Sequence, residues 1–83
     1  MKAKRIRLYI KPGCPWCREA VAWLNHRGFA HETYDVFADP AAYEEMIRLT
    51  GQSLAPVIEV DGQVLADFGA TELARWWEDR ESI

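Results

Sequence analysis

Residues 9–17 read Tyr9-Ile10-Lys11-Pro12-Gly13-Cys14-Pro15-Trp16-Cys17. The aliphatic run that ends at Ile10 predicts a β-strand, and Lys11-Pro12-Gly13 is typical of a turn. Pro15 suits the first position of a helix, where its missing N–H costs nothing, so Cys14 is predicted to cap that helix. Cys17 then lies one helical turn further on. This stretch predicts a strand, a turn and a helix that carries two cysteines at its start.

The chain has two cysteines, and their Cys-x-x-Cys spacing at a helix start indicates thiol–disulfide chemistry. A thiol attacks a disulfide as the thiolate, and the positive end of a helix favours that charged form. Cys14 is therefore the candidate nucleophile, and Cys17 is the candidate thiol that resolves a mixed disulfide. Two alternatives stay open. One is a structural disulfide, and the other is a zinc site, for which His26 and His31 are the only candidate histidines, at a spacing that fits a zinc finger poorly.

Length and composition indicate one globular domain over residues 1–83. The apolar share of 49 % and the charged share of 28 % are ordinary globular values, and the short chain allows only a small core. The formal charge of -3 gives no general attraction to nucleic acid. No run approaches the roughly 18 apolar residues of a membrane span, and no targeting segment precedes the first strand. We therefore expect a cytoplasmic protein that binds neither nucleic acid nor a membrane.

Hydrophobic periodicity divides the chain into alternating strands and helices. The expected strands are Arg5–Ile10, His31–Val36, Pro56–Val60 and Val64–Ala66, and the expected helices are Pro15–Arg27, Pro40–Gly51 and Thr71–Arg80. Asp39-Pro40 predicts a capped helix start, and Asp61-Gly62 predicts a two-residue hairpin turn. The apolar face of the second helix is expected to comprise Tyr43, Met46, Ile47 and Leu49.

The resulting order, β-α-β-α-β-β-α, predicts an α/β fold with a four-stranded mixed sheet flanked by helices. A β-α-β unit crosses over with a right hand and pairs its strands in parallel, whereas a hairpin adds antiparallel strands. In open α/β sheets, ligands bind at the carboxyl ends of the strands. Cys14 follows the first strand at such an end, so the motif and the predicted topology agree.

With these elements placed, the chain resembles the glutaredoxin family, within the thioredoxin-like fold, over nearly its whole length. Three stretches carry the resemblance. They are residues 9–17, with Trp16 in place of the usual tyrosine; residues 49–57, with Leu54-Ala55-Pro56 where the family has Thr-Val-Pro; and residues 61–69, with Ala66-Asp67 where two glycines are expected.

The resemblance implies that Cys14 attacks, that Cys17 resolves, and that Pro56 is a cis-proline facing the dithiol. A proline donates no amide, so the backbone of Ala55 would be left to pair with an extended substrate.

The resemblance also implies a glutathione site. Lys11 and Gln52 match positions that hold the glycyl carboxylate of glutathione, and Trp16 keeps the aromatic face of the tyrosine that it replaces. Asp67 and Phe68 match the place where backbone amides receive the γ-glutamyl carboxylate. Asp67 departs from the family pattern, and its carboxylate has two expected roles: to cap the following helix or to repel the incoming carboxylate.

The sequence therefore predicts a glutathione-dependent thiol–disulfide oxidoreductase that reduces protein disulfides or glutathione mixed disulfides, with no tightly bound cofactor or metal. The expected partners are glutathione, disulfide-containing or glutathionylated proteins, and a reductase. Three alternatives stay open. They are a redoxin recharged by a thioredoxin-type reductase, a module that binds zinc or bridges an iron–sulfur cluster between two chains, and an interaction domain without catalysis.

Overall fold

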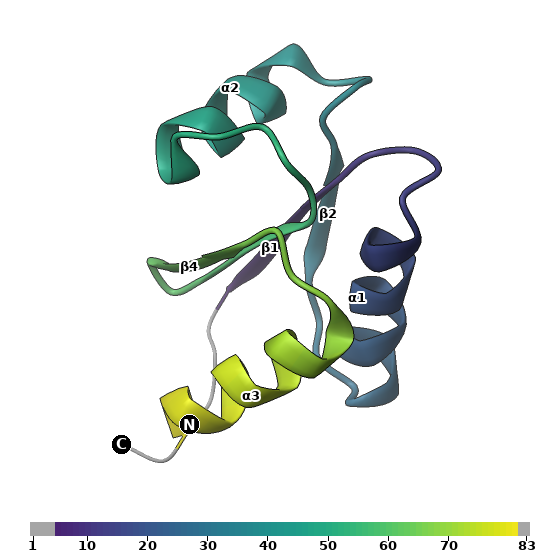
Figure 1. Cartoon of the computed structure of the whole chain (residues 1–83), viewed down its shortest axis with the longest axis vertical. Helices are drawn as coiled ribbons and strands as arrows, with labels where there is room; N and C mark the ends of the chain where they lie inside the picture. The colour runs from purple at the N-terminus through teal and green to yellow at the C-terminus, as the bar shows by residue number, and fades with distance from the viewer. Residues whose placement is uncertain (1–4, 82–83) are drawn as a thin grey trace.

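A computed structural model describes residues 5–81, which form a four-stranded mixed sheet and three helices (Figure 1). The elements are β1 (Ile6–Ile10), α1 (Pro15–His26), β2 (Glu32–Asp35), α2 (Pro40–Thr50), β3 (Val57–Val60), β4 (Gln63–Ala66) and α3 (Ala70–Glu81). The predicted element order is confirmed, and each predicted boundary coincides with the observed one or differs from it by one residue.

The strands of the sheet lie in the order β2-β1-β3-β4. β1 pairs in parallel with β2, as the right-handed crossover through α1 requires, and it pairs antiparallel with β3. β4 pairs antiparallel with β3 across the predicted hairpin turn. In that turn Asp61 and Gly62 both have positive φ angles, of 50° and 91°, which is the conformation that a two-residue hairpin turn demands. The mixed sheet and the Asp61-Gly62 turn are both confirmed.

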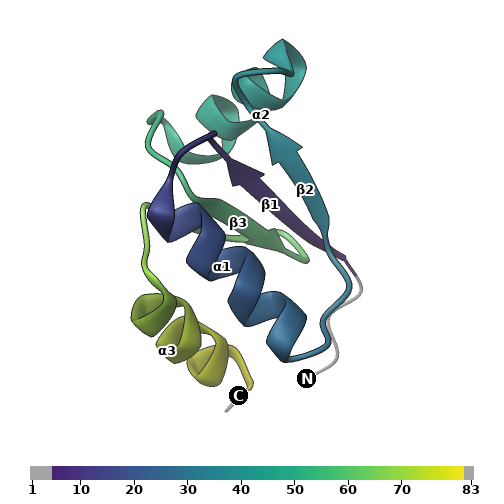
Figure 2. The same cartoon turned by 90° about the vertical axis from the view of Figure 1, so that its right-hand side faces the viewer.

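Two hydrophobic layers cover the two faces of the sheet (Figure 2): α1 and α3 pack on one face, and α2 packs on the other. Side chains of a strand point alternately to opposite faces. Leu8 of β1 accordingly lies in the cluster with α1 and α3, whereas its neighbour Tyr9 lies in the cluster with α2. The last helix contributes the buried Trp77 and the half-buried Trp76 to the first cluster.

The buried face of α2 differs from the predicted one. Ala42 and Met46 are buried against the sheet, whereas Tyr43 is 38 % exposed. Positions 42 and 46 are one helical turn apart and share a face, and position 43 lies about 100° around the helix from 42. The prediction for Tyr43 is therefore wrong. The face of α2 that carries the small Ala42 packs on the sheet, and the large ring of Tyr43 lies beside that face.

The start of α2 follows the sequence prediction. Asp39 caps the helix, and its carboxylate accepts hydrogen bonds from the N–H groups of Ala41 at 3.1 Å and Ala42 at 3.2 Å. Gly51 ends the helix in the left-handed region, at φ 71°. Within residues 5–81, none of the helices has both the length and the apolar character that a membrane crossing requires.

Candidate active site

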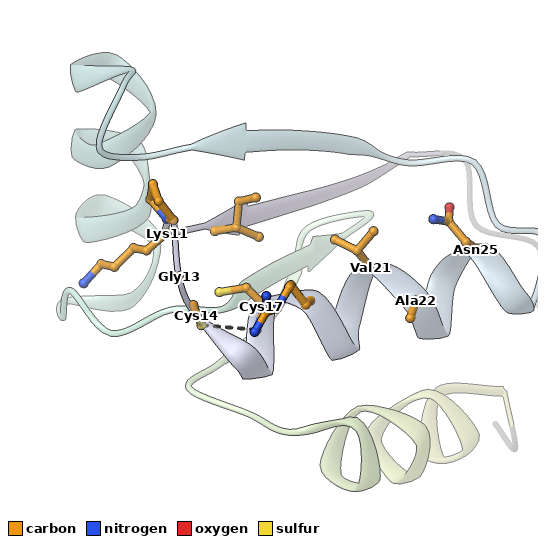
Figure 3. Close-up of a pocket in the computed structure, with 10 residues that line it drawn as sticks. Lys11, Gly13, Cys14, Cys17, Val21, Ala22 and Asn25 are labelled. Carbon is orange, nitrogen blue, oxygen red and sulfur yellow. Dashed lines mark hydrogen bonds between the residues drawn. The ribbon is translucent and has the colours of Figure 1, made fainter.

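Cys14 is the N-cap residue of α1, as predicted, with an extended backbone (φ −92°, ψ 110°). Its sulfur accepts a hydrogen bond from the N–H of Cys17 at 3.1 Å, drawn as a dashed line in Figure 3. Pro15 follows at the first helical position, and the first turn of α1 contains no acidic residue. A negative charge on the Cys14 sulfur therefore faces the positive end of the helix without a competing carboxylate in that turn.

Cys17 lies one turn inside α1 and is only 2 % exposed. Burial raises the pKa of the Cys17 thiol to about 12, and the hydrogen bond with Cys14 adds to this shift. Cys17 is therefore protonated at neutral pH. Cys14 is partly exposed, so the two thiols differ in accessibility as well as in position. This is the asymmetry that a nucleophile and its resolving partner need.

A groove of about 400 Å³ runs along α1 beside the dithiol and reaches both cysteines (Figure 3). Its walls are largely apolar, formed by Ile10, Pro12, Gly13, Val21 and Ala22, with Lys11, Arg18 and Asn25 as polar members. The groove gives a partner molecule room beside Cys14.

Two predicted ligand residues bond to the protein itself. Lys11 Nζ donates to the carbonyl oxygen of Ser53, which joins the turn before α1 to the loop before β3. The side-chain oxygen of Gln52 accepts from the N–H of Leu54, and its nitrogen donates to the Leu54 carbonyl at 3.1 Å. An ammonium group has three donors, so Lys11 has donors left for a ligand. The glycyl carboxylate contacts of Lys11 and Gln52 stay predictions.

The Ala55–Pro56 peptide bond is cis, which confirms the expectation drawn from the family resemblance. Pro56 is fully buried, and its carbonyl oxygen accepts a hydrogen bond from the N–H of Asp67 at 2.9 Å. The loop before β3 is thereby tied to the segment that precedes α3. Pairing of the half-buried Ala55 with an extended substrate stays a prediction.

A second pocket, of about 240 Å³, is lined by Trp16, Asp67, Phe68, Gly69 and Glu72. Trp16 is 55 % exposed, forms one wall of this pocket and directly precedes Cys17. Asp67 is exposed and has a positive φ of 54°, a conformation that suits the glycine expected at this position. Phe68 is only 4 % exposed, because its side chain packs in the core under α1 and α3.

Glu72 belongs to this pocket, although the sequence analysis did not select it. Its Oε1 accepts a hydrogen bond from the N–H of Gly69 at 2.9 Å, and Gly69 is the residue just before α3. Glu72, and not Asp67, bonds this amide, and the capping and repulsion roles of Asp67 both stay predictions. A glutamate at the third residue of a helix is half of a capping box, and this signal could have identified Glu72 from the sequence.

The side chains that could bind a metal are spread over the described part of the chain. Among residues 5–81, no group of three or more His, Cys, Asp or Glu side chains is arranged to hold a metal ion. His26 is exposed, and one ring nitrogen of His31 is hydrogen-bonded to the Phe29 carbonyl at 3.0 Å. That the protein binds no metal stays a prediction.

Comparisons of the sequence with known proteins place it in one family. The glutaredoxin family model matches residues 6–65, which is most of the chain. A glutaredoxin-like 8.6 kDa protein from the rubredoxin operon of Clostridium pasteurianum is 34 % identical over 68 residues, covering 82 % of this chain and 91 % of that protein. Glutaredoxin 3 of Escherichia coli is 33 % identical over 58 residues, covering 70 % of each chain.

Solved structures show the same fold. The thioredoxin-like protein BC3987 superposes with a TM-score of 0.78 at 31 % identity, covering 86 % of this chain and 97 % of that chain. NrdH-redoxin of Escherichia coli is a glutaredoxin-like protein with a thioredoxin-like activity profile. It superposes with a TM-score of 0.71 at 27 % identity, covering 86 % of this chain and 92 % of that chain. These likenesses confirm the thioredoxin-like fold, and the family match confirms the resemblance drawn from the three sequence stretches: the chain belongs to the glutaredoxin family.

Proposed function

We propose that this protein is a dithiol oxidoreductase that reduces disulfide bonds in other proteins through Cys14 and Cys17. The observation that carries the proposal is the asymmetry of the two thiols. The Cys14 sulfur lies at the positive end of α1 beside an open groove, whereas Cys17 is buried one turn further in and protonated. Membership of the glutaredoxin family supports the same chemistry.

In the first step, the Cys14 thiolate attacks one sulfur of a substrate disulfide. The bond between Cys14 and that sulfur forms as the substrate S–S bond breaks, and the departing thiolate takes a proton from water. Cys17 then loses its proton and attacks the Cys14 sulfur, which releases the second substrate sulfur as a thiol. The substrate gains two electrons and two protons, and Cys14 and Cys17 become a disulfide.

The raised pKa of Cys17 helps to order these steps. Burial is its main cause, and the hydrogen bond and the negative charge of Cys14 add to it. Both contributions of Cys14 end when its sulfur enters a mixed disulfide. Cys17 therefore becomes easier to deprotonate at the step in which it must attack.

The electrons that recharge the dithiol have two candidate sources. Glutathione is favoured by the family resemblance and by Lys11, which lines the groove and whose ammonium group, bonded to the Ser53 carbonyl, has donors left for a carboxylate. A protein dithiol, such as that of a thioredoxin-type reductase, is favoured by the two carboxylates in the Trp16 pocket, Asp67 and Glu72. In the family, this is the place that receives a carboxylate of glutathione. We propose a protein dithiol as the main electron donor and glutathione as a weaker one.

The test compares two recharging systems on the same oxidised protein. One contains thioredoxin reductase with NADPH, and the other contains glutathione, glutathione reductase and NADPH, each with insulin as the disulfide substrate. We expect NADPH consumption with both systems and a faster rate with thioredoxin reductase. Cys14→Ser is the control and should be inactive in each. Turnover that persists in Cys14→Ser, or no turnover with either system, would contradict the oxidoreductase proposal.

Three further expectations belong to this function and stay proposals. The protein needs no tightly bound cofactor, because the dithiol itself carries the two electrons. Glutathionylated proteins are a second substrate class, since they present the same kind of S–S bond. A cytoplasmic location completes the proposal, because dithiols are kept reduced in that compartment.

A further inference from the structure

Glu72 is an exposed residue whose carboxylate lines the Trp16 pocket. Its Oε1 lies 2.9 Å from the Gly69 nitrogen and would lie 2.9 Å from a Cβ atom placed on Gly69. The same Cβ position is 3.7 Å from Cε3 of the Trp16 ring. Glu72 therefore places a negative charge against the backbone that starts α3, next to the aromatic residue that separates the two cysteines.

This arrangement opposes the binding of a substrate carboxylate. The N–H groups at a helix start bind anions because they are unpaired and lie at the positive end of the helix. Here the Gly69 N–H is already paired with a carboxylate of the same helix. The five residues that line the pocket also include Asp67 and no lysine or arginine. An incoming carboxylate that bonds the Gly69 N–H must displace Glu72, and it approaches a second negative charge on Asp67.

We propose that Glu72 is a specificity-determining residue of the dithiol site. By bonding the Gly69 N–H, it occupies the position that a substrate carboxylate would take at the start of α3. The site then discriminates against anionic thiol groups such as glutathione and accepts mixed disulfides that present a neutral group at this place. The inference rests on the proposed oxidoreductase function and adds Glu72 to Asp67 as a cause of the proposed weak use of glutathione.

The experiment uses one peptide in two forms. Its single cysteine carries either glutathione, which is anionic, or β-mercaptoethanol, which is neutral, as a mixed disulfide. Release of the peptide thiol is measured with the full chain, recharged by a reductase that does not depend on glutathione. The reported quantity is the ratio of kcat/KM for the glutathione form to kcat/KM for the mercaptoethanol form. This ratio cancels any general loss of folded protein, because both substrates meet the same preparation.

We expect Glu72→Ala to raise this ratio about tenfold, the effect of removing roughly 1.4 kcal/mol of charge repulsion. Glu72→Gln keeps an oxygen that can accept from Gly69 and removes the charge, so it should raise the ratio by a smaller factor. Glu78→Ala is the matched control, because it removes an exposed carboxylate of α3 outside the pocket. It should leave the ratio at the wild-type value.

The outcomes separate the inference from the function on which it rests. An unchanged ratio in both Glu72 variants overturns the specificity role of Glu72. An equal rise in Glu78→Ala also overturns it, because the effect would then come from the net charge of the helix. A wild-type protein that releases no thiol from either peptide overturns the proposed function instead. Circular dichroism melting of each variant confirms that α3 remains folded without its cap.

Discussion

At the starts of both α1 and α3, a side chain accepts a hydrogen bond from a backbone N–H, but the two acceptors differ in their chemistry. At α1 the acceptor is the Cys14 sulfur, 3.1 Å from the Cys17 nitrogen, and the first turn holds no acid. At α3 the acceptor is the Glu72 carboxylate, 2.9 Å from the Gly69 nitrogen. A thiol can gain and lose its charge during a reaction, whereas a carboxylate is charged throughout at neutral pH. In the proposed function, the helix start without a carboxylate is the reactive one, and the helix start with a carboxylate limits what binds beside it.

The largest expected effect comes from replacing the cysteines at the start of α1. Cys14→Ser removes the nucleophile, so it should abolish thiol–disulfide exchange. Cys17→Ser should still attack and accumulate a mixed disulfide. It should retain part of the activity on glutathionylated peptides, because a second glutathione can resolve the Cys14 disulfide. Mass spectrometry of each variant after reaction with a peptide disulfide measures the mixed disulfide. Equal adduct formation by the two variants would refute the assignment of roles.

The next effect concerns the charge beside α3. Two unit charges about 4 Å apart at an effective dielectric of 20 interact by about 4 kcal/mol before screening, so a screened remnant of roughly 1.4 kcal/mol costs a factor of ten in affinity. Asp67→Gly should therefore lower the KM for glutathione about tenfold by this estimate. Steady-state kinetics with glutathione as the variable substrate measure it.

Asp67→Asn is the control for this prediction. Asparagine tolerates the positive φ of 54° at this position and carries no charge, so it separates repulsion from backbone conformation. Repulsion predicts that both variants lower the KM. A KM that rises in both would mean that Asp67 bonds the ammonium group of glutathione, and the repulsion explanation would then be wrong.

The fold could be predicted because its signals are local. Pro15, Asp39-Pro40 and Asp61-Gly62 each restrict the backbone within a few residues, and the structure confirms a helix start or a turn at all three. The buried face of α2 was harder to predict, because the ring of Tyr43 has more apolar area to bury than the methyl group of Ala42. The packing of α2 on the sheet decides which of these two residues is buried, and the sequence of the helix alone does not show that packing.

The candidate site likewise contains residues that could be predicted from the sequence and residues that could not. The cysteine pair and its position on α1 follow from spacing and turn chemistry alone. The cis bond before Pro56 and the proposed ligand positions needed the family resemblance. The sequence prediction does not include Glu72, because this residue lies outside the three stretches that match the family pattern. Its bond to Gly69 becomes visible once the start of α3 and the Trp16 pocket are placed together.

A third prediction uses pH to examine the buried thiol of α1. Burial raises the pKa of Cys17 to about 12, and burial also raises the pKa of Tyr9. Each group ionises in the unfolded chain before it does so in the folded one, so the stability present at neutral pH is lost as the pH rises. For Cys17 the loss begins near pH 9 and continues toward pH 12. One group changes the unfolding free energy by at most about 1.4 kcal/mol per pH unit.

Urea unfolding of the reduced protein between pH 8 and 10.5 measures this loss. Cys17→Ser should show a shallower decline than the wild type, because serine does not ionise in this range, and the contribution of Tyr9 remains in both. If the free energy of unfolding declined in parallel in the two proteins, ionisation of the Cys17 thiol would not be the cause of the loss of stability at high pH.

The smallest expected effect compares a cap that only stabilises with a cap that reacts. Asp39 accepts hydrogen bonds from the N–H groups of Ala41 and Ala42 at the start of α2, away from the dithiol. Asp39→Ala should lower the unfolding free energy by about 1 kcal/mol, which for a domain of this size is roughly 4–8 °C in Tm, and should leave kcat/KM unchanged. Cys14→Ser should do the reverse: a serine hydroxyl is a good helix cap, so the Tm is kept while the activity is lost. Thermal melts and insulin reduction on the same samples measure both quantities. If Asp39→Ala lost activity in proportion to its stability, or Cys14→Ser melted well below the wild type, helix capping and catalysis would not be separable in this fold.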